Sequence, residues 1–157
     1  MNLSTEKAIF AAGCFWGVQE EFDKLPGVIS TRVGYTGGRM HNPTYEDVCS
    51  DTTEHAEAVE IIFNPKEISY SQLLDAFWGM HDATQLNKQG NDFGKQYRSA
   101  IFYTNSKQRE LAIESKELEQ QMTKEKIVTQ IVKATEFYEA ESLHQKYYQK
   151  KGKGFSV

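Results

Sequence analysis

Apolar residues recur along the chain with two periods, which predict strands and helices in alternation. Short apolar runs predict strands over residues 7–12, 28–35, 55–63, 98–103 and 127–132. Apolar residues at three- and four-residue spacing predict helices beginning at Cys14 and near Ser69, and helices over 106–122 and 140–150. In the helix over 106–122 we expect Leu111, Leu118 and Met122 to face inward.

Two long polar stretches separate these elements. Residues 39–53 contain Asn42-Pro43 and little periodicity, so we expect a loop with one helical turn. Residues 81–96 contain two glycines and no predicted element, and connections of that length are often functional. The number and mixture of strands and helices predict an α/β (α+β) fold, a two-layer sandwich of a mixed β-sheet with flanking helices.

Length and composition limit the class of protein. The 157 residues fit one domain, since domains run to roughly 100–200 residues, so we expect residues 1–157 to form a single catalytic domain. Hydrophobic residues at 39% and charged residues at 25% indicate a globular rather than a disordered chain. The net charge of −4 disfavours nucleic acid as a partner, and no apolar run approaches the ~18 residues that span a bilayer. A monomer is the expected state.

The chain has two cysteines, Cys14 and Cys49. No secretory signal is visible at the N-terminus, so the two thiols point to a reducing compartment, and we expect the cytoplasm. A free thiol in such a compartment is catalytic, bound to a metal, or simply buried.

Cys14 follows a predicted strand and Gly13 and opens a predicted helix. This position places its sulfur near unpaired backbone N–H groups, where the positive end of the helix dipole favours the nucleophilic thiolate. The placement indicates a reactive cysteine. An ordinary buried cysteine is an equally open interpretation.

Phe15 and Trp16 come directly after Cys14. Successive helix positions point about 100° apart, so one ring can pack into the core while the other lines the cleft that the sulfur faces. The alternative is that both are core aromatics.

Glu57 is the most informative carboxylate. In a strand over 55–63 it shares a face with Val59 and Ile61. An ionised carboxylate is costly on an apolar face, so its pKa should rise, as a general acid requires. The alternative places Glu57 at the solvent-exposed end of the strand, near Glu54.

Tyr45, Asp92 and Tyr97 fall in predicted loops or at a strand start. Polar groups can converge on a pocket there, and the two phenols could donate hydrogen bonds to a ligand oxygen. Taken singly, the simpler interpretation of each is a surface residue.

Neither a metal site nor a phosphate-binding loop is indicated. His55-Ala56-Glu57 matches half of a zinc deaminase signature, but the second half, Pro-Cys-x-x-Cys, does not occur. The four histidines lack the paired spacing of zinc ligands, and residues 34–38 do not match a dinucleotide fingerprint. We therefore expect no bound metal, and no motif here points to a nucleotide cofactor.

Gly13-Cys14-Phe15-Trp16-Gly17 resembles the signature of the class A peptide methionine sulfoxide reductases. The resemblance extends in order along almost the whole chain: Gly34-Tyr35-Thr36-Gly37-Gly38, Asn42-Pro43-Thr44-Tyr45, His55-Ala56-Glu57-Ala58-Val59, Gly90-Asn91-Asp92, Gln96-Tyr97-Arg98-Ser99 and His144-Gln145-Lys146-Tyr147. Several motifs in the family's order make the resemblance specific.

The resemblance implies a reaction and a role for each residue. Cys14 would attack the sulfur of a methionine S-sulfoxide, free or in an oxidised protein, and end as a sulfenic acid. Phe15 and Trp16 would hold the S-methyl group. Glu57 would protonate the sulfoxide oxygen, because this oxygen is a poor leaving group without a proton. Tyr45 and Tyr97 would donate hydrogen bonds, and Asp92 would orient the substrate or a water.

The C-terminus departs from the family pattern. Many members end in a glycine-aromatic-cysteine segment whose cysteine resolves the sulfenic acid, but Ser156 stands at that place here. Serine cannot form a disulfide. Either Cys49 resolves Cys14, or an external thiol such as glutathione, glutaredoxin or thioredoxin attacks the sulfenic acid directly; we favour Cys49 as a bystander.

Two other classes of function fit Cys14. A Cys–His–Glu hydrolase or acyltransferase would use His55 or His81 as its base. A redox-sensing module would oxidise Cys14 without turnover. Both rank behind the reductase.

Overall fold

A computed structural model describes residues 4–154, and its centre is a six-stranded mixed sheet in the order β7-β6-β1-β3-β2-β8. The predicted mixed sheet with flanking helices is confirmed. Its strands are β1 (Glu6–Ala12), β2 (Val28–Thr36), β3 (Ala56–Phe63), β6 (Ser99–Tyr103), β7 (Gln130–Lys133) and β8 (Tyr138–Glu139), and a separate hairpin holds β4 (Lys88–Gln89) and β5 (Asp92–Phe93). The helices are α1 (Phe15–Asp23), α2 (Tyr45–Cys49), α3 (Tyr70–Gly79), α4 (Ser106–Gln121) and α5 (Tyr147–Gly154), with the short 3₁₀ turns η1 (Lys95–Tyr97) and η2 (Ser142–His144).

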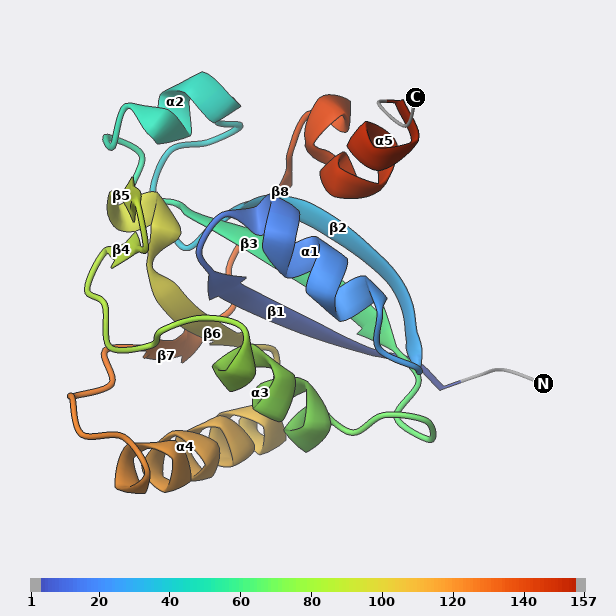
Figure 1. Ribbon diagram of the computed structural model, residues 1–157, viewed down its shortest axis with the longest axis vertical. Helices are drawn as coiled ribbons and strands as arrows, with labels where there is room; N and C mark the ends of the chain where they lie inside the picture. Colours follow the sequence, from blue (N-terminus) through green and yellow to red (C-terminus); the bar gives the residue numbers. More distant parts are fainter. Residues whose placement is uncertain (1–3, 155–157) are drawn as a thin grey trace.

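Helices α1, α3 and α4 cover one face of the sheet (Figure 1). The core on this face is aromatic: the Phe10 ring of β1 stacks 5.3 Å from Phe22 of α1 and 5.2 Å from Phe77 of α3. All three rings are fully buried. Burial of one such side chain stabilises the fold by roughly 1.5–3 kcal/mol, so this triple contact fixes α1 and α3 against β1.

The opposite face of the sheet carries small side chains, mainly alanines. Its buried residues are Ile9, Ala11, Ala56, Ala58, Ala100 and Phe102. Ala134 and Phe137, from the segment that joins β7 to β8, pack against them. Because these side chains are small, the single segment between β7 and β8 is enough to cover this core.

The strand register gathers several strand ends at one edge of the sheet. Ala12 at the end of β1 pairs with Ser99 at the start of β6. Glu57, near the start of β3, pairs with a residue near the end of β2. Because Cys14 follows β1 and Tyr97 precedes β6, the same edge receives Cys14, Glu57 and Tyr97.

The inward face predicted for α4 is partly wrong. Gln108 and Ala112 are its buried residues, whereas Leu118 is 61% and Met122 77% exposed. Leu118 lies six residues after Ala112, about 240° around the helix, so the two cannot share a face.

The last predicted helix is wrong over residues 140–146. Ala140 continues the pairing of β8, since its N–H donates to the carbonyl oxygen of Val33 at 2.9 Å. Lys146 then has a φ of +56°, which interrupts the helix, and α5 begins only at Tyr147. The predicted strand over 127–132 is displaced to 130–133, because Val128 N–H bonds to the Ala83 carbonyl oxygen instead of a strand neighbour.

The single helical turn expected within residues 39–53 is confirmed as α2. Its N-cap, Thr44, accepts a hydrogen bond from Asp47 N–H at 3.2 Å, and the Asp47 carboxylate accepts from Thr44 N–H at 2.9 Å. This capping box explains how so short a helix begins at Tyr45.

Candidate active site

Cys14 is the N-cap residue of α1, with a half-buried side chain that makes no capping hydrogen bond. Burial raises the pKa of its thiol to about 12, and the charge of Glu57 acts in the same direction. The nearby backbone N–H groups of Trp16 and Gly17 lower it by less. The helix N-terminus thus acts in the expected direction, but burial of the sulfur outweighs it, so the resting thiol holds its proton.

Glu57 is buried, with 1% of its surface exposed, so it does not lie at a solvent-exposed strand end. Its Oε1 accepts a hydrogen bond from the backbone N–H of Phe15 at 3.2 Å. Its Oε2 is also buried and has no partner among the described residues. Burial raises the pKa of Glu57 to about 8, against the lowering effect of the Phe15 hydrogen bond. At neutral pH the carboxyl group therefore holds a proton, and Oε2 is the oxygen free to donate it.

Phe15 and Trp16 point in different directions, as their adjacent helix positions require. Phe15 is 1% exposed and packs in the core. Trp16 is half-buried, and its Nε1–H donates to Nδ1 of His144 at 3.0 Å. Its ring stacks on Tyr147 of α5 with centroids 3.8 Å apart and planes 9° apart. The C-terminal segment thus holds the Trp16 ring beside the site.

Tyr45 begins α2 and Tyr97 ends η1. Burial raises the pKa of both phenols, that of Tyr97 to about 12, and the charge of Glu57 contributes to each. Both hydroxyl groups therefore stay protonated at neutral pH and are available as donors near Glu57.

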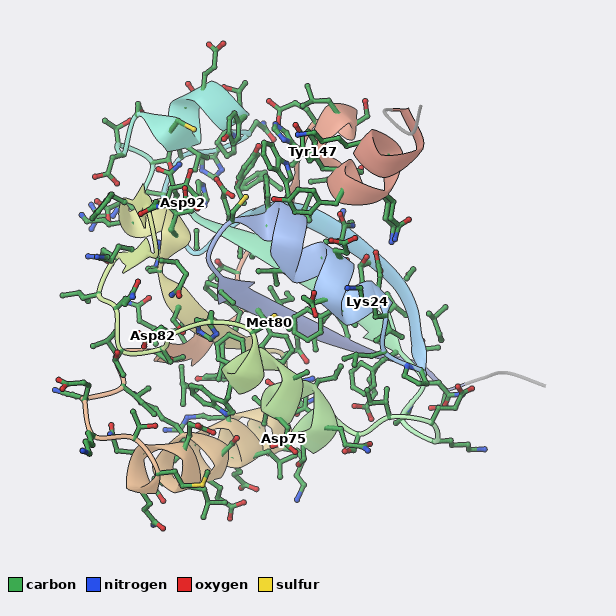
Figure 2. The ribbon with its side chains drawn as sticks, in the orientation of Figure 1. Lys24, Asp75, Met80, Asp82, Asp92 and Tyr147 are labelled. Atoms are coloured by element: carbon green, nitrogen blue, oxygen red, sulfur yellow. The ribbon has the colours of Figure 1, made fainter. Side chains whose placement is uncertain are left out.

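Asp92 lies on β5 at the tip of the small hairpin, and its side chain is exposed. Its negative charge acts on Cys14, Glu57 and Tyr97. Figure 2 shows Asp92 and Tyr147 on either side of the start of α1. The long polar stretch 81–96 thus brings a carboxylate to the same edge of the sheet.

Glu141 was not predicted as a site residue. Its Oε1 accepts from the Tyr35 hydroxyl and its Oε2 from the Tyr45 backbone N–H, both at 2.9 Å. Although burial acts to raise the pKa of Glu141, these hydrogen bonds hold it below its usual value. Tyr35 is fully buried and pairs with Glu57 across β2 and β3, so Glu141 positions α2 against the site. No sequence pattern marks this contact, which spans 96 residues.

Cys49 ends α2 and is exposed. The buried Gln96 donates from its Nε2 to Cys49 Sγ at 3.5 Å, a contact that the sequence did not predict. The charges of both cysteines act on the pKa of Tyr97, which places the Tyr97 phenol within range of Cys14 and Cys49.

The histidines that a hydrolase would need are engaged elsewhere. His55 accepts from Gly38 N–H at 3.0 Å with one ring nitrogen, and its other nitrogen contacts a backbone carbonyl oxygen at 2.7 Å. His81 contacts a backbone carbonyl oxygen at 2.8 Å and Ser99 Oγ at 2.7 Å. Neither ring has a nitrogen left to activate Cys14.

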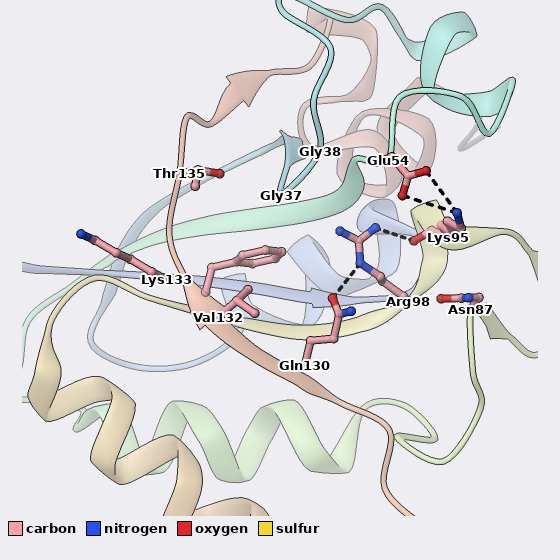
Figure 3. A pocket seen from close by; sticks show the side chains of 11 residues that line it. Gly37, Gly38, Glu54, Asn87, Lys95, Arg98, Gln130, Val132, Lys133 and Thr135 are labelled. Atoms are coloured by element: carbon pink, nitrogen blue, oxygen red, sulfur yellow. Dashed lines mark hydrogen bonds and ion pairs between the residues drawn. The ribbon is translucent and has the colours of Figure 1, made fainter.

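Cavity size does not by itself locate the chemistry. Cys14 lines a cavity of about 340 Å³ together with Val18, Met80 and Tyr148. A larger cavity of about 500 Å³ lies on another part of the surface and contains none of the predicted site residues (Figure 3). Within residues 4–154, no three His, Cys, Asp or Glu side chains are grouped so as to hold a metal ion, and no helix is long and apolar enough to cross a membrane.

A family model described as peptide methionine sulfoxide reductase matches residues 6–156. The chain belongs to this family. It is an oxidoreductase that reduces methionine sulfoxide with an external thiol as the source of electrons.

Individual relatives agree with this assignment. The peptide methionine sulfoxide reductase MsrA of Methanosarcina acetivorans is 57% identical over 149 residues, which cover 94% of this chain and 79% of that protein. The crystal structure of reduced Mxr1 from Saccharomyces cerevisiae superposes with a TM-score of 0.91 at 33% identity, covering 97% of this chain and 88% of that one. Mxr1 in complex with Trx2 superposes with a TM-score of 0.66 at 25% identity, covering 94% and 89%.

Proposed function

We propose that this reductase acts on the S epimer of methionine sulfoxide, free and in oxidised proteins, through a sulfenic acid formed on Cys14. The observation that carries the proposal is the buried Glu57 carboxyl group, hydrogen-bonded to Phe15 N–H immediately after Cys14, with its second oxygen unpartnered among the described residues. This arrangement supplies a nucleophile and a proton donor to one sulfoxide group.

The reaction balances with the groups present. Glu57 gives its proton to the sulfoxide oxygen, which makes the substrate sulfur more electrophilic. Cys14 Sγ attacks that sulfur and forms an Sγ–S bond, while its thiol proton passes to the Glu57 carboxylate. The hydroxyl group then moves to Sγ, which breaks both the substrate S–O bond and the Sγ–S bond, so that Sγ is oxidised and the substrate sulfur is reduced. A thiol and a sulfoxide thus become a sulfenic acid and a thioether, and Glu57 ends protonated as it began.

The remaining residues orient the sulfoxide. Phe15 and Trp16 hold the S-methyl group, while the Tyr45 and Tyr97 hydroxyl groups donate to the oxygen and stabilise its growing negative charge. Asp92 orients the substrate or a water. With methyl and oxygen fixed on different walls, only one sulfur configuration leaves the substrate sulfur open to Sγ, which would select one epimer.

An external thiol then regenerates Cys14, with Cys49 as a bystander. The yeast relative's complex with Trx2 supports thioredoxin as the reductant, and glutaredoxin or glutathione would act by the same attack. Ser156, which replaces the usual resolving cysteine, lies outside the described residues. We further propose that residues 1–157 act as one monomeric domain without a bound cofactor, in the cytoplasm, where thiol reductants keep Cys14 and Cys49 reduced.

A single turnover without reductant tests the proposal. The protein is mixed with an excess of the S epimer of methionine sulfoxide, methionine is counted per enzyme, and the intact mass is taken. One methionine with one added oxygen atom, absent in Cys14→Ser, is the expected result. One methionine with the loss of two hydrogens would make Cys49 the resolving residue, and no methionine would overturn the proposal.

A further inference from the structure

The cavity of about 500 Å³ is lined in part by η1, and Cys14 is not among its lining residues. One wall is the glycine pair that follows β2, and the others come from η1, β6 and β7 (Figure 3). Its chemistry-bearing residues are Glu54, Asn87, Lys95, Arg98, Gln130 and Lys133. The Gln96-Tyr97-Arg98-Ser99 motif therefore contributes to two places, since Tyr97 lies in the sulfoxide site and Arg98 in this cavity.

Cations outnumber anions in this cavity. Lys95, Arg98 and Lys133 face a single carboxylate, Glu54. Lys95 Nζ occupies both oxygens of Glu54, at 3.1 and 3.4 Å. Among residues 4–154, Arg98 and Lys133 form no ion pair, and the carboxylate whose charge acts on Arg98, that of Glu54, is already bonded to Lys95.

The Arg98 guanidinium is fixed in place and only partly used. Its Nε donates to Gln130 Oε1 at 3.0 Å and its Nη1 to the Lys95 carbonyl oxygen at 2.9 Å. Its Nη2 makes no hydrogen bond within the described chain. A Cβ on Gly37 would lie 3.0 Å from Nη2, so the glycine leaves room for the guanidinium. Burial lowers the pKa of Arg98, which shows that water solvates this cation poorly.

We propose that this cavity binds an oxyanion, a phosphate or carboxylate group of a small molecule, through Arg98 Nη2. Guanidinium groups recognise both groups because their donors lie in a rigid plane that matches two oxygens. Gln130 supports the assignment, because its carbonyl oxygen already accepts from Arg98 and its amide N–H groups remain as donors. The competing interpretation is that Arg98 only braces η1 against β7.

Binding is tested by titrating inorganic phosphate, and separately acetate, against the whole protein at constant ionic strength, with chloride as the exchanged anion. The readouts are NMR shifts of the Gly37 and Gly38 amides and of the Arg98 Nε–H. We expect saturable shifts with half-saturation at roughly 1–10 mM, the range that one charge-assisted contact supports. Saturation by phosphate alone assigns a phosphate-bearing ligand, and by acetate alone a carboxylate.

Arg98→Gln should weaken this binding at least about tenfold, whereas the control Arg109→Gln, on the exposed face of α4, should bind as the unmodified protein does. If Arg98→Gln does not fold, Lys133→Gln replaces it, with an expected loss of about two- to threefold at low salt. Shifts that rise linearly with every anion, or equal binding by Arg98→Gln, would overturn the proposal and leave Arg98 a brace. The result is independent of reductase activity.

Discussion

The backbone N–H of Phe15 and the carboxyl group of Glu57 are joined by one hydrogen bond of 3.2 Å, which satisfies Oε1 and leaves Oε2 unpartnered among the described residues. A buried carboxyl with one free oxygen is costly for stability when it ionises. The same feature is useful in catalysis, because it keeps a transferable proton at neutral pH.

The rate of methionine formation in a single turnover should be nearly constant below pH 8 and fall above it. The pKa of Glu57 is about 8, so each further pH unit removes roughly nine-tenths of the protonated acid. Glu57→Gln keeps the acceptor for Phe15 N–H but has no proton to transfer, and should be about 10²–10³-fold slower with no fall above pH 8. Stopped-flow quenching at several pH values measures both. A rate that rises up to pH 8 and then stays level would show that a preformed thiolate attacks.

Glu57→Gln should be more stable than the unmodified protein at pH 9 and about equally stable at pH 5. The pKa of Glu57 is raised in the folded state, so between its usual value near 4.5 and about 8 the folded protein binds more protons than the unfolded chain. Stability is therefore lost as pH rises through this window, by up to a few kcal/mol, and glutamine does not suffer that loss. Urea unfolding at the two pH values, with Glu117→Gln on exposed α4 as a control, decides the matter.

Cys49→Ser should keep steady-state turnover within about twofold with both dithiothreitol and thioredoxin. The Cys49 thiol is exposed, accepts from the Gln96 amide at 3.5 Å, and lies near the Tyr45 hydroxyl, whose pKa it raises. A free cysteine with such neighbours behaves as a small apolar side chain. A large loss confined to the thioredoxin assay would instead identify Cys49 as the resolving residue.

Glu141→Gln should raise KM for methionine sulfoxide about tenfold with a smaller change in kcat. Glutamine keeps one neutral acceptor oxygen, so either the Tyr35 hydroxyl or the Tyr45 N–H loses its acceptor, at a cost of about 1–3 kcal/mol. Tyr45 then shifts relative to the sulfoxide while Cys14 and the proton donor stay in place. Glu136→Gln, an exposed change in the segment before β8, should leave both constants unaltered. A lower kcat together with a lower free energy of unfolding, and no change in KM, would argue for a purely structural role.

Gly34→Ala should destabilise the protein by about 1–3 kcal/mol, and Gly79→Ala should be neutral or stabilise it by up to about 1 kcal/mol. A Cβ on Gly34 would overlap the Tyr138 carbonyl oxygen and approach the Phe137 ring to 2.5 Å, so β8 would have to move away from β2. Nothing lies within 4 Å of a Cβ on Gly79, at the end of α3. Thermal unfolding of the pair measures the difference.

The sequence predicted best where a feature is local. The strand before Cys14, the helix after it and the burial of Glu57 all follow from apolar periodicity within about ten residues. β8 escaped detection because two paired residues are too few to show a period. In α4, the spacing of apolar residues does not determine which helix face meets the sheet, and for this reason the prediction that Leu118 and Met122 face inward is wrong.

The part of the site that the sequence could not predict depends on distant contacts. Burial and the charge of Glu57 raise the pKa of Cys14, against the lowering effect of the α1 N-terminus. Glu57 lies 43 residues further along the chain and comes close to Cys14 only through the strand register. Trp16 and His144 are 128 residues apart, and a positive φ at Lys146 precedes α5. Neither a contact between residues far apart in the sequence nor a positive φ produces a periodic pattern of apolar residues.

The contacts of Trp16 with His144 and Tyr147 also have a consequence for synthesis. Cys14 and α1 leave the ribosome long before the segment that covers them, residues 141–154. A nascent chain can thus form β1, α1 and β3 while Trp16 still lacks its hydrogen-bond partner and the ring that stacks on it. Catalytic competence should appear only after residues 141–154 have left the ribosome, and ribosome-bound chains halted at residue 140 should be folded in part yet inactive.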